Sequence, residues 1–577
     1  MKLTEALRIR QGAAGVPNSF QVALACGFTP LHLETFLAAH LQQALPGRRV
    51  EVATGLYGDL AGTLERFAEI EADAFAVALE WPDLDPRLGY RNLGGWGPSE
   101  EIDMVKHAQA TLARMRAAIE RAPASVPMAI SLPTLPLPPA FHTPGWQASA
   151  AALDIQQSLA CFAAETARRP IHRVLNAQYL TGRSAPGSAL DLKTEILTGF
   201  PYTLAHADAV GEALARLIQP PPVKKGLITD LDDTLWNGLV GEEGPDGVNW
   251  DLSNHGGLHG LYQQLLGGLA AQGTLLAIAS KNDPAVVDRA LSRTDLLVRR
   301  DSVFPVEVGW HAKSESVGRI LKTWNIAADS IVFVDDSPME LAEVKAAWPE
   351  IECRLFPKKD YDATHALFQE LRDLFGKSSV GAEDALRLAS IRRAAELAQD
   401  AVVSGATPDE FLAQAGSVML VEFNPPPEDT RVLELVNKTN QFNLNGQRHT
   451  ESEWRRELET PGAFVMAVSY EDKFGPLGKI AVLKGVARNG DVDINAWVMS
   501  CRAFSRRIEH RCMEILFERF GAEQLRFAFA ATPKNSPTAE MLERFLGARP
   551  QGEVSLSRAR FAECVPALYH KVEYNHG

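Results

Sequence analysis

The sequence has few cysteines, and none of the six belongs to a Cys-x-x-Cys pair. Their spacing indicates neither a zinc ribbon nor the disulfide framework of a small secreted protein, so we expect a protein of the reducing cytoplasm. The cysteines are Cys26, Cys161, Cys353, Cys501, Cys512 and Cys564.

Long apolar runs and an excess of positive charge are also lacking. No apolar stretch approaches the ~20 residues of a membrane span, and residues 1–20 do not contain the apolar core of a signal peptide. The 58 Lys and Arg residues are outnumbered by 72 Asp and Glu residues, which gives a formal net charge of −14. We therefore expect neither a nucleic acid nor a membrane as the partner.

The length predicts several domains, because 577 residues exceed the roughly 100–200 residues of one domain. A content of 46% hydrophobic and 23% charged residues is typical of a soluble globular protein. Three consecutive prolines at 220–222 and a Gly- and Ser-containing stretch at 376–381 are typical of linkers. We predict domains at 1–221, 222–378 and 379–577.

Short apolar runs alternate with longer amphipathic runs in the first two domains, which predicts an α/β fold with mostly parallel sheets covered by helices. In the first domain the runs that predict strands lie at 21–26, 50–54, 74–79, 126–131 and 174–179. Beyond residue 418 the pattern predicts a third, mixed α+β domain.

Acidic and basic residues follow several predicted strands of the second domain. Asp230 and Asp232 come directly after the apolar run 226–229, at the end of a parallel strand, where α/β folds place their ligands. An isolated Asp-x-Asp is more often a solvated turn. Here, however, Ser280, Lys313 and the pair Asp335–Asp336 follow in order, each at a strand end or a helix start.

This ordered set resembles the haloacid dehalogenase superfamily of aspartate-nucleophile phosphotransferases, which implies a Rossmann-like parallel sheet in the second domain. The resemblance implies that Asp230 is the nucleophile and Asp232 the general acid and base. It also implies phosphate binding by Ser280, Lys281 and Lys313, and Mg²⁺ binding by Asp230, Asp232, Asp335 and Asp336. Carboxylates crowded into one crevice repel each other, and a hard cation such as Mg²⁺ relieves that repulsion.

A narrower resemblance is carried by residues 230–245, 334–338, 433–444 and 499–502. They are similar to the FkbH-like branch of that superfamily, and the Asn-rich stretch Val436-Asn437-Lys438-Thr439-Asn440 is specific to it. The branch takes a glyceryl group from 1,3-bisphosphoglycerate and loads it onto the phosphopantetheine thiol of an acyl carrier protein in polyketide biosynthesis. The resemblance implies the same substrate and partner here.

The chemistry of such a substrate needs two nucleophiles. If Asp230 attacked the acyl phosphate, the activation of the acyl group would be lost, so we assign it to the 3-phosphate and assign the acyl group to a thiol. That thiol is either the carrier arm or Cys501 as a relay, with His449 and His510 as candidate bases. The alternative for Cys501 is a buried structural cysteine. The alternatives for the whole protein are a plain Mg²⁺-dependent phosphatase of a small phosphoester and a scaffold that only binds phosphorylated ligands.

The outer domains resemble two further folds. The first is similar to SGNH hydrolases, but Cys26-Gly27-Phe28-Thr29 stands where the nucleophilic serine belongs, and His206 and Asp208 do not restore a triad. We therefore expect a catalytically silent docking or structural domain with a buried Cys26.

The third domain resembles the acetyltransferase-like (GNAT) fold. Arginine and serine replace the glycines of its pyrophosphate turn, which favours carrier-protein docking by Arg502, Arg506 and Arg507, with Arg511 nearby. The alternative is an ordinary solvated helix start.

Overall fold

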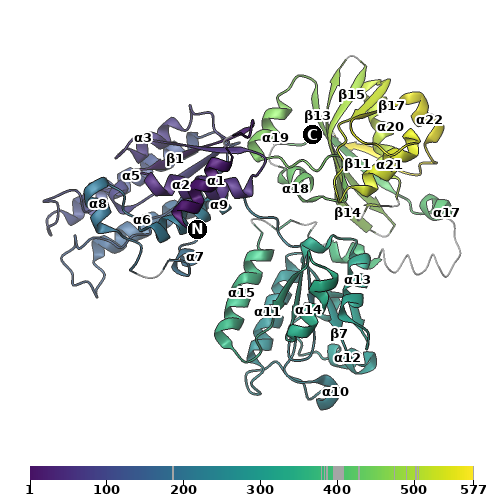
Figure 1. The fold of residues 1–577 in the computed structure, drawn as a ribbon, viewed down its shortest axis with the longest axis horizontal. Helices are drawn as coiled ribbons and strands as arrows, with labels where there is room; N and C mark the ends of the chain where they lie inside the picture. The colour runs from purple at the N-terminus through teal and green to yellow at the C-terminus, as the bar shows by residue number, and fades with distance from the viewer. Residues whose placement is uncertain are drawn as a thin grey trace. The chain divides into compact units, whose positions relative to one another are not determined.

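The computed structural model describes residues 1–577 except 14, 185–186, 378–379, 382–383, 385–386, 394–407, 427–428, 474, 489, 501–502, 505 and 576–577. The described chain divides into two compact units (Figure 1). Met1–Pro221 and Thr450–Arg456 make up the first unit, and Pro222–His449 and Glu457–Gly577 make up the second. Residues 378 and 379 of the second predicted linker lie outside the described residues, and the boundary at 378 stays a prediction.

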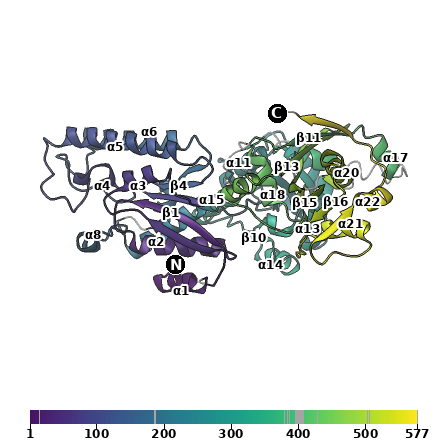
Figure 2. The same ribbon diagram turned by 90° about the horizontal axis from the view of Figure 1, so that it is seen from above.

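The first unit contains a five-stranded parallel sheet in the order β2-β1-β3-β4-β5. Helices α1, α2 and α9 cover one face, and α3, α5 and α6 cover the other (Figure 2). The strands are β1 (Ser19–Cys26), β2 (Arg49–Thr54), β3 (Ala74–Ala78), β4 (Met128–Ser131) and β5 (His172–Val174). The helices are α1 (Leu3–Gly12), α2 (Leu31–Ala44), α3 (Leu60–Arg66), α4 (Trp81–Leu84), α5 (Glu101–Arg121), α6 (Ala150–Thr166), α7 (Ala177–Thr181), α8 (Leu192–Thr198) and α9 (Leu204–Ile218).

The strand predicted at 174–179 is wrong over most of its length. Strand β5 ends at Val174, and helix α7 begins at Ala177. The reason is local, because the Asn176 side chain accepts a hydrogen bond from the Gln178 N–H at 3.1 Å and caps the helix.

The second unit begins with another five-stranded parallel sheet, in the order β10-β9-β6-β7-β8. In β6 the buried Leu227 packs with α11, α12 and α15, whereas the buried Ile228 packs with α13 and α14 on the opposite face. The strands are β6 (Gly226–Thr229), β7 (Leu275–Ser280), β8 (Val303–Val308), β9 (Ile331–Asp335) and β10 (Glu352–Leu355). The helices are α10 (Val240–Glu243), α11 (Gly257–Ala271), α12 (Pro284–Leu291), α13 (Lys313–Trp324), α14 (Pro338–Ala347) and α15 (Tyr361–Phe375).

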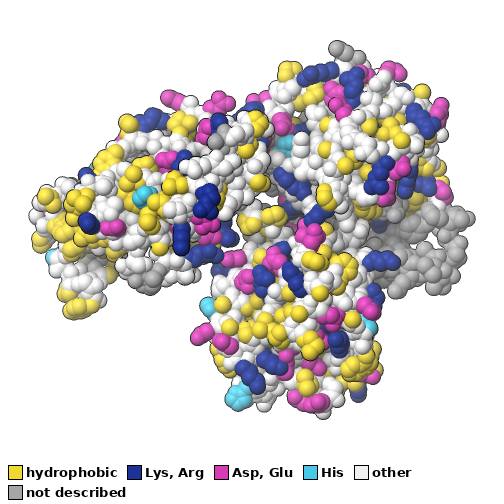
Figure 3. Space-filling model, in the orientation of Figure 1, with side chains coloured by type: hydrophobic (Ala, Val, Ile, Leu, Met, Phe, Trp, Pro, Cys, Tyr) yellow, Lys and Arg dark blue, Asp and Glu magenta, His cyan; other side chains and the backbone are white. Residues whose placement is uncertain are grey.

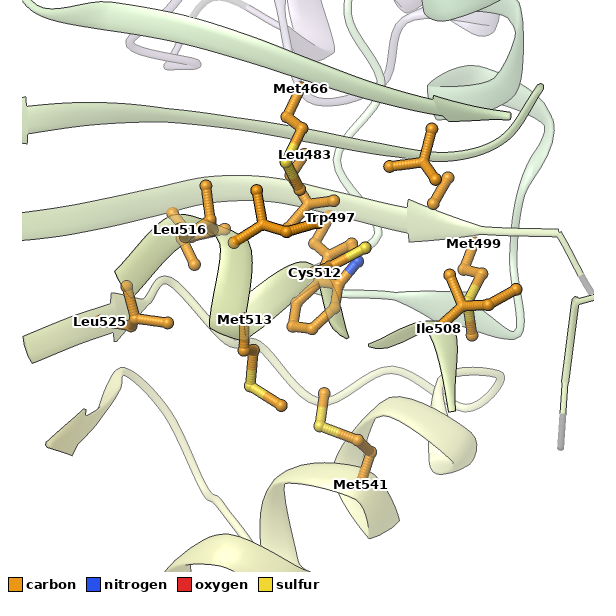
Figure 4. Packing of buried hydrophobic residues seen from close by; sticks show 14 of the residues in the cluster. Met466, Leu483, Trp497, Met499, Ile508, Cys512, Met513, Leu516, Leu525 and Met541 are labelled. Carbon is orange, nitrogen blue, oxygen red and sulfur yellow. The ribbon is translucent and has the colours of Figure 1, made fainter. Parts of the chain in front are cut away.

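A mixed sheet forms the C-terminal part, in the order β17-β16-β15-β14-β13-β11-β18, with β12 paired to β15. Its core packs strands against α20, α21 and α22, with Trp497, Cys512 and Met541 among the buried side chains (Figure 4). The strands are β11 (Val418–Phe423), β12 (Phe442–Asn443), β13 (Ala463–Asp472), β14 (Gly475–Arg488), β15 (Asp491–Met499), β16 (Gln524–Phe527), β17 (Val554–Ser557) and β18 (Lys571–Asn575). The helices are α17 (Pro408–Ala413), α18 (Thr430–Lys438), α20 (Ile508–Phe520), α21 (Ser536–Leu546) and α22 (Arg558–Cys564). Helix α19 (Glu451–Leu458) belongs to the first unit as far as Arg456.

Two parallel sheets and one mixed sheet confirm the predicted α/β fold class. Among the described residues, no helix combines the length and the apolar character that crossing a bilayer requires. On the face of the molecule in Figure 3, basic and acidic side chains are intermingled, in keeping with the slight acidic excess of the sequence.

Gly226 starts the strand that leads to Asp230, and its backbone lies close to a buried ring. A Cβ atom at this position would lie 2.5 Å from Trp324 Cζ3, and Trp324 is only 1% exposed. We predict that Gly226→Ala destabilises the protein by about 1–3 kcal/mol, because the buried ring has little room to move.

Gly268→Ala is the matched control, because no described atom lies within 4 Å of the Cβ that alanine would add to this exposed glycine of α11. It should leave stability unchanged or raise it by up to about 1 kcal/mol. Urea unfolding followed by tryptophan fluorescence measures both effects. Equal midpoints for the two variants would contradict the close packing at Gly226.

Candidate active site

The candidate site lies at the carboxyl ends of the central strands of the β6–β10 sheet. Asp230 directly follows β6, and Asp335 is the last residue of the neighbouring strand β9. The helix after β6 packs on one face and the helix after β9 on the other. Such a reversal opens a crevice beyond the strand ends, where α/β proteins bind ligands.

A buried ammonium group joins the carboxylates in this crevice. The Lys313 Nζ atom lies 2.9 Å from Asp230 Oδ1 and 2.6 Å from Asp335 Oδ2, and it also contacts the Glu340 carboxylate. Lys313 is 2% exposed, Asp335 0% and Asp230 6%. Helix α13 begins at Lys313 and so places this cation at the strand ends.

We call this ion group of Lys313, Asp230, Asp335 and Glu340 the Lys313 cluster. Burial and the neighbouring charges shift the pKa values of its members in opposite directions. Burial raises the pKa of Asp230 and of Asp335, and the Asp230 charge raises the pKa of Asp335 further, whereas Lys313 lowers both. For Lys313, burial lowers the pKa, but the carboxylates outweigh burial and the pKa is raised. The cation is therefore held in its charged form by its partners.

The cluster fits a hard divalent cation. Asp230, Asp335 and Glu340 each offer one carboxylate oxygen, and the three atoms lie within 4.8 Å of one another. Carboxylate oxygens are the donors that Mg²⁺ prefers. Two of the four residues predicted to bind metal, Asp230 and Asp335, belong to this group.

The side chain of Asp336 lies in a different ion group. Its Oδ2 atom is 2.9 Å from Lys358 Nζ, which also lies 2.5 Å from Asp233 Oδ2. The Asp336 N–H donates to Thr234 Oγ1 at 3.1 Å. Neighbouring residues at the end of a strand point in different directions, which separates Asp336 from Asp335.

The carboxylate of Asp232 is held by three donors. Its Oδ1 atom accepts hydrogen bonds from Trp236 Nε1 at 2.8 Å and from the Val240 N–H at 3.1 Å. Its Oδ2 atom accepts from Asn282 Nδ2 at 3.0 Å, and the same amide contacts Ser280 Oγ at 3.2 Å. Asn282 thus links the predicted acid/base residue to the predicted phosphate-binding serine.

Two residues of this site were not predicted. Asn282 lies two positions after Ser280 and is 4% exposed, and Glu340 lies in the first turn of α14. The feature of the sequence that could have indicated Glu340 is its position as a carboxylate in the first turn of the helix after β9. Lys281, predicted to bind phosphate, lies 3.1 Å from Glu340 Oε1 and 3.7 Å from Glu343 Oε2.

The segment 236–250 is folded onto the hydrophobic core of this part of the chain. It contains one antiparallel bridge, Asn237 to Asn249, and the short helix α10. Trp236 is 0% and Trp250 6% exposed. Only Gly238 and Gly244 of its four glycines adopt a positive φ, of 105° and 79°.

The predicted thiol relay and the predicted docking arginines lie in the C-terminal domain, away from the Lys313 cluster in the sequence. Cys501 and Arg502 lie outside the described residues, so the thiol relay stays a prediction. Arg506 Nε lies 3.3 Å from Asp472 Oδ2, and Arg507 Nη1 lies 2.6 Å from Asp409 Oδ1. Arg511 contacts Glu514 on the same helix. These carboxylates offset the positive charge on which the docking prediction rests.

The candidate bases His449 and His510 are both buried beside carboxylates. His449 Nδ1 lies 3.4 Å from Glu457 Oε2, and His510 Nδ1 lies 3.2 Å from Glu509 Oε1. Glu457 also contacts Lys484, whose pKa burial lowers to about 8. Their roles as bases stay predictions.

The Asn-rich stretch and its continuation build local structure. The Asn445 side chain donates to the carbonyls of Asn495 at 2.9 Å and Ala528 at 3.2 Å. Asn535, 2% exposed, donates to the Asn443 carbonyl at 3.0 Å. The Asn445 amide thus ties the end of β12 to β15, and the Asn535 amide ties β12 to the start of α21, because buried backbone groups need partners.

In the first unit, Cys26 is buried as predicted. It is 3% exposed, its thiol contacts the Phe28 carbonyl, and burial raises its pKa. Asp208 lies 2.7 Å from His40 and also contacts the N-terminal amine of Met1.

Comparisons with known proteins give evidence on the fold of the chain. No family model and no curated protein matches the chain. The N-terminal part of protein BF1531 from Bacteroides fragilis, which contains a phosphatase domain and was crystallised with Mg, aligns over 66% of this chain and 100% of its own. The identity is 18% and the TM-score is 0.51, which supports a shared α/β fold.

A salicylyl-acyltransferase, SsfX3 from a tetracycline biosynthetic pathway, aligns over 35% of this chain and 55% of its own. Its identity is 11% and its TM-score 0.21, which is too low to carry an argument.

The different surroundings of Asp335 and Asp336 give a test for the metal site. We predict that Asp335→Asn raises the Mg²⁺ dissociation constant at least about tenfold, because it removes a charged oxygen from the cluster. Asp336→Asn is the control and should change it less than about threefold, since its carboxylate faces Lys358. Isothermal titration calorimetry measures both, and equal losses would contradict this assignment.

Proposed function

We propose that the protein is a Mg²⁺-dependent phosphotransferase that takes a phosphoryl group from a phosphate ester onto Asp230 and passes it to water. The observation that carries this proposal is the Lys313 cluster at the carboxyl edge of the sheet. A buried lysine bound to two strand-end carboxylates keeps Asp230 ionised where burial alone would protonate it. An ionised carboxylate is the form that attacks phosphorus.

We assign the bond to phosphorus to Asp230 and the proton transfers to Asp232, with water as the second reactant. Lys313 binds Asp230 Oδ1, so we assign Oδ2 as the nucleophile. It bonds to phosphorus while the ester oxygen leaves with its electron pair and takes a proton from Asp232. The ionised Asp232 then removes a proton from water, whose oxygen attacks the phosphorus and frees Asp230.

Positive and polar groups would hold the substrate during these steps. The hydroxyl of Ser280 and the ammonium groups of Lys281 and Lys313 are the proposed phosphate partners. Asp230, Asp335 and Glu340 are the residues that fit Mg²⁺, which when bound supplies positive charge to the phosphoryl oxygens. The phosphatase domain and the Mg named for the BF1531 structure are in keeping with this chemistry.

For the substrate we propose the glyceryl phosphate chemistry that the FkbH-like resemblance implies. In this proposal Asp230 removes the 3-phosphate of a glyceryl group derived from 1,3-bisphosphoglycerate. A thiol takes the acyl group, with phosphate as its leaving group, and the product is a glyceryl thioester of an acyl carrier protein. Support comes from the residues at 230–245 and 433–444. A small phosphoester without acyl transfer is the alternative substrate.

Replacing the nucleophile tests the phosphotransfer step. We predict that Asp230→Asn lowers Mg²⁺-dependent phosphate release from p-nitrophenyl phosphate by at least about a thousandfold, because an amide oxygen is a poor nucleophile. Asp246→Asn, at an exposed position, should keep the wild-type rate. A phosphate assay measures release, and a fully active Asp230→Asn variant would overturn the role of Asp230.

Intact mass spectrometry of a carrier protein tests the proposed substrate. The wild-type protein is incubated with Mg²⁺, 1,3-bisphosphoglycerate and a phosphopantetheinylated carrier protein. We expect a dephosphorylated glyceryl adduct, and a phosphorylated adduct with Asp230→Asn, since that variant still permits thiol attack on the acyl group. Free phosphate without any adduct would select the small-phosphoester alternative, and neither product would indicate a scaffold.

A further inference from the structure

Large apolar side chains are exposed on the segments that follow four of the five strands of the β6–β10 sheet. Leu239 follows β6 and is 39% exposed, Trp310 follows β8 and is 77% exposed, and Met339 follows β9 and is 80% exposed. Tyr361 follows β10 and is 66% exposed. We call these four side chains the apolar rim. Because the strands are parallel, all four segments start from the edge of the sheet that carries Asp230.

Two members of the apolar rim are neighbours in sequence of residues that build the candidate active site. Trp310 follows Gly309, whose N–H donates at 3.1 Å to the carbonyl of Ser280, a proposed phosphate partner. Met339 precedes Glu340, whose carboxylate is one of the three that fit Mg²⁺. Both side chains therefore lie close to the groups proposed to bind the phosphate and the metal.

The other two members come from the segments that follow β6 and β10. Leu239 precedes Val240, whose N–H donates to Asp232 Oδ1 at 3.1 Å. Tyr361 begins helix α15, on the carboxyl side of β10. The apolar rim thus comes from four segments, and three of them also hold residues of the site.

The reactive groups are covered, in contrast to the apolar rim. Asp230 is only 6% exposed and Ser280 only 3% exposed. A phosphate at the end of a slender arm can reach such a nucleophile, while the bulk of the molecule that carries it stays outside. Exposed apolar side chains that gather in one region mark interaction sites, and Trp, Tyr and Met are enriched in protein interfaces. A buried nucleophile with an apolar rim therefore fits a partner protein that presents its phosphate on an arm.

We propose that Asp230 acts on a phosphate ester borne by the carrier protein, and that the carrier docks on the apolar rim. This inference rests on the phosphotransferase function proposed above, and it adds the order of the two reactions. Loading of the arm comes first, and removal of the phosphate follows on the loaded carrier.

The order can be written with all groups in balance. The thiol of the arm loses its proton to water and bonds to the acyl carbon of the acyl phosphate, whose phosphate leaves with the electron pair of the broken C–O bond. The carrier then holds a thioester that still bears one phosphate ester. Asp230 and Asp232 remove that phosphate by the steps assigned above, with water as the second reactant.

One substrate presented in two forms tests the docking. The probe is the 3-phosphoglyceryl thioester of phosphopantetheine, either free or attached to a carrier protein, and Mg²⁺-dependent phosphate release by the full-length protein is measured. We expect kcat/KM to be at least about tenfold higher for the carrier-borne form, because only that form covers the apolar rim. Equal values for the two forms would overturn the proposal.

Substitutions in the apolar rim place the docking surface. The double variant Trp310→Ala/Met339→Ala should bring the two kcat/KM values to within about threefold of each other, because it removes the two most exposed side chains of the rim. Since each variant is compared with itself on two forms of one substrate, a general loss of folded protein cancels.

Trp146→Ala is the matched control, because Trp146 is an 87% exposed tryptophan of the first unit. It should keep the wild-type preference for the carrier-borne form. Loss of the preference in Trp146→Ala with the double variant unaffected would place docking on the first unit and contradict the apolar rim. Release of phosphate from neither form, nor from p-nitrophenyl phosphate, would overturn the phosphotransferase function itself and this inference with it.

Discussion

The candidate active site depends on one buried cation. The Lys313 ammonium lies within 3 Å of carboxylate oxygens from two neighbouring strand ends, and it also contacts Glu340. Without it, Asp230 and Asp335 would face each other in a buried crevice, where each raises the cost of ionising the other. The parallel sheet and the helix that starts at Lys313 position this ion group, and the proposed chemistry depends on it.

The sequence was sufficient to place the strands that carry this site. Apolar runs predicted β6, β7 and β9, and the polar residues after them were expected at one edge because parallel strands end on the same side. The directions of side chains could not be predicted in this way. Asp335 and Asp336 are adjacent in sequence, but Asp336 pairs with Lys358, a residue 22 positions further along the chain. Only the folded chain shows that partner.

Contacts between distant segments explain the other differences. The hydrogen bonds that run from Ser184 through His206 and Thr134 to Glu80 join four separate segments with no shared motif, so the sequence alone does not indicate them. The Asn-rich stretch was specific enough to indicate a family branch, yet its continuation at Asn443 and Asn445 serves to hold β12 in place. A sequence pattern can identify a segment without showing whether it acts in chemistry or in folding.

The central claim is that Asp230 forms a bond to phosphorus. Acid quenching of the Asp232→Asn variant during turnover of a radiolabelled phosphate ester tests it directly, because loss of the base should slow hydrolysis of the covalent intermediate. The account predicts a phosphoryl group on the protein, mapped to the peptide that contains Asp230 by borohydride reduction. Phosphate release by the wild type with no label trapped on Asp230, or with the label on another residue, would contradict it.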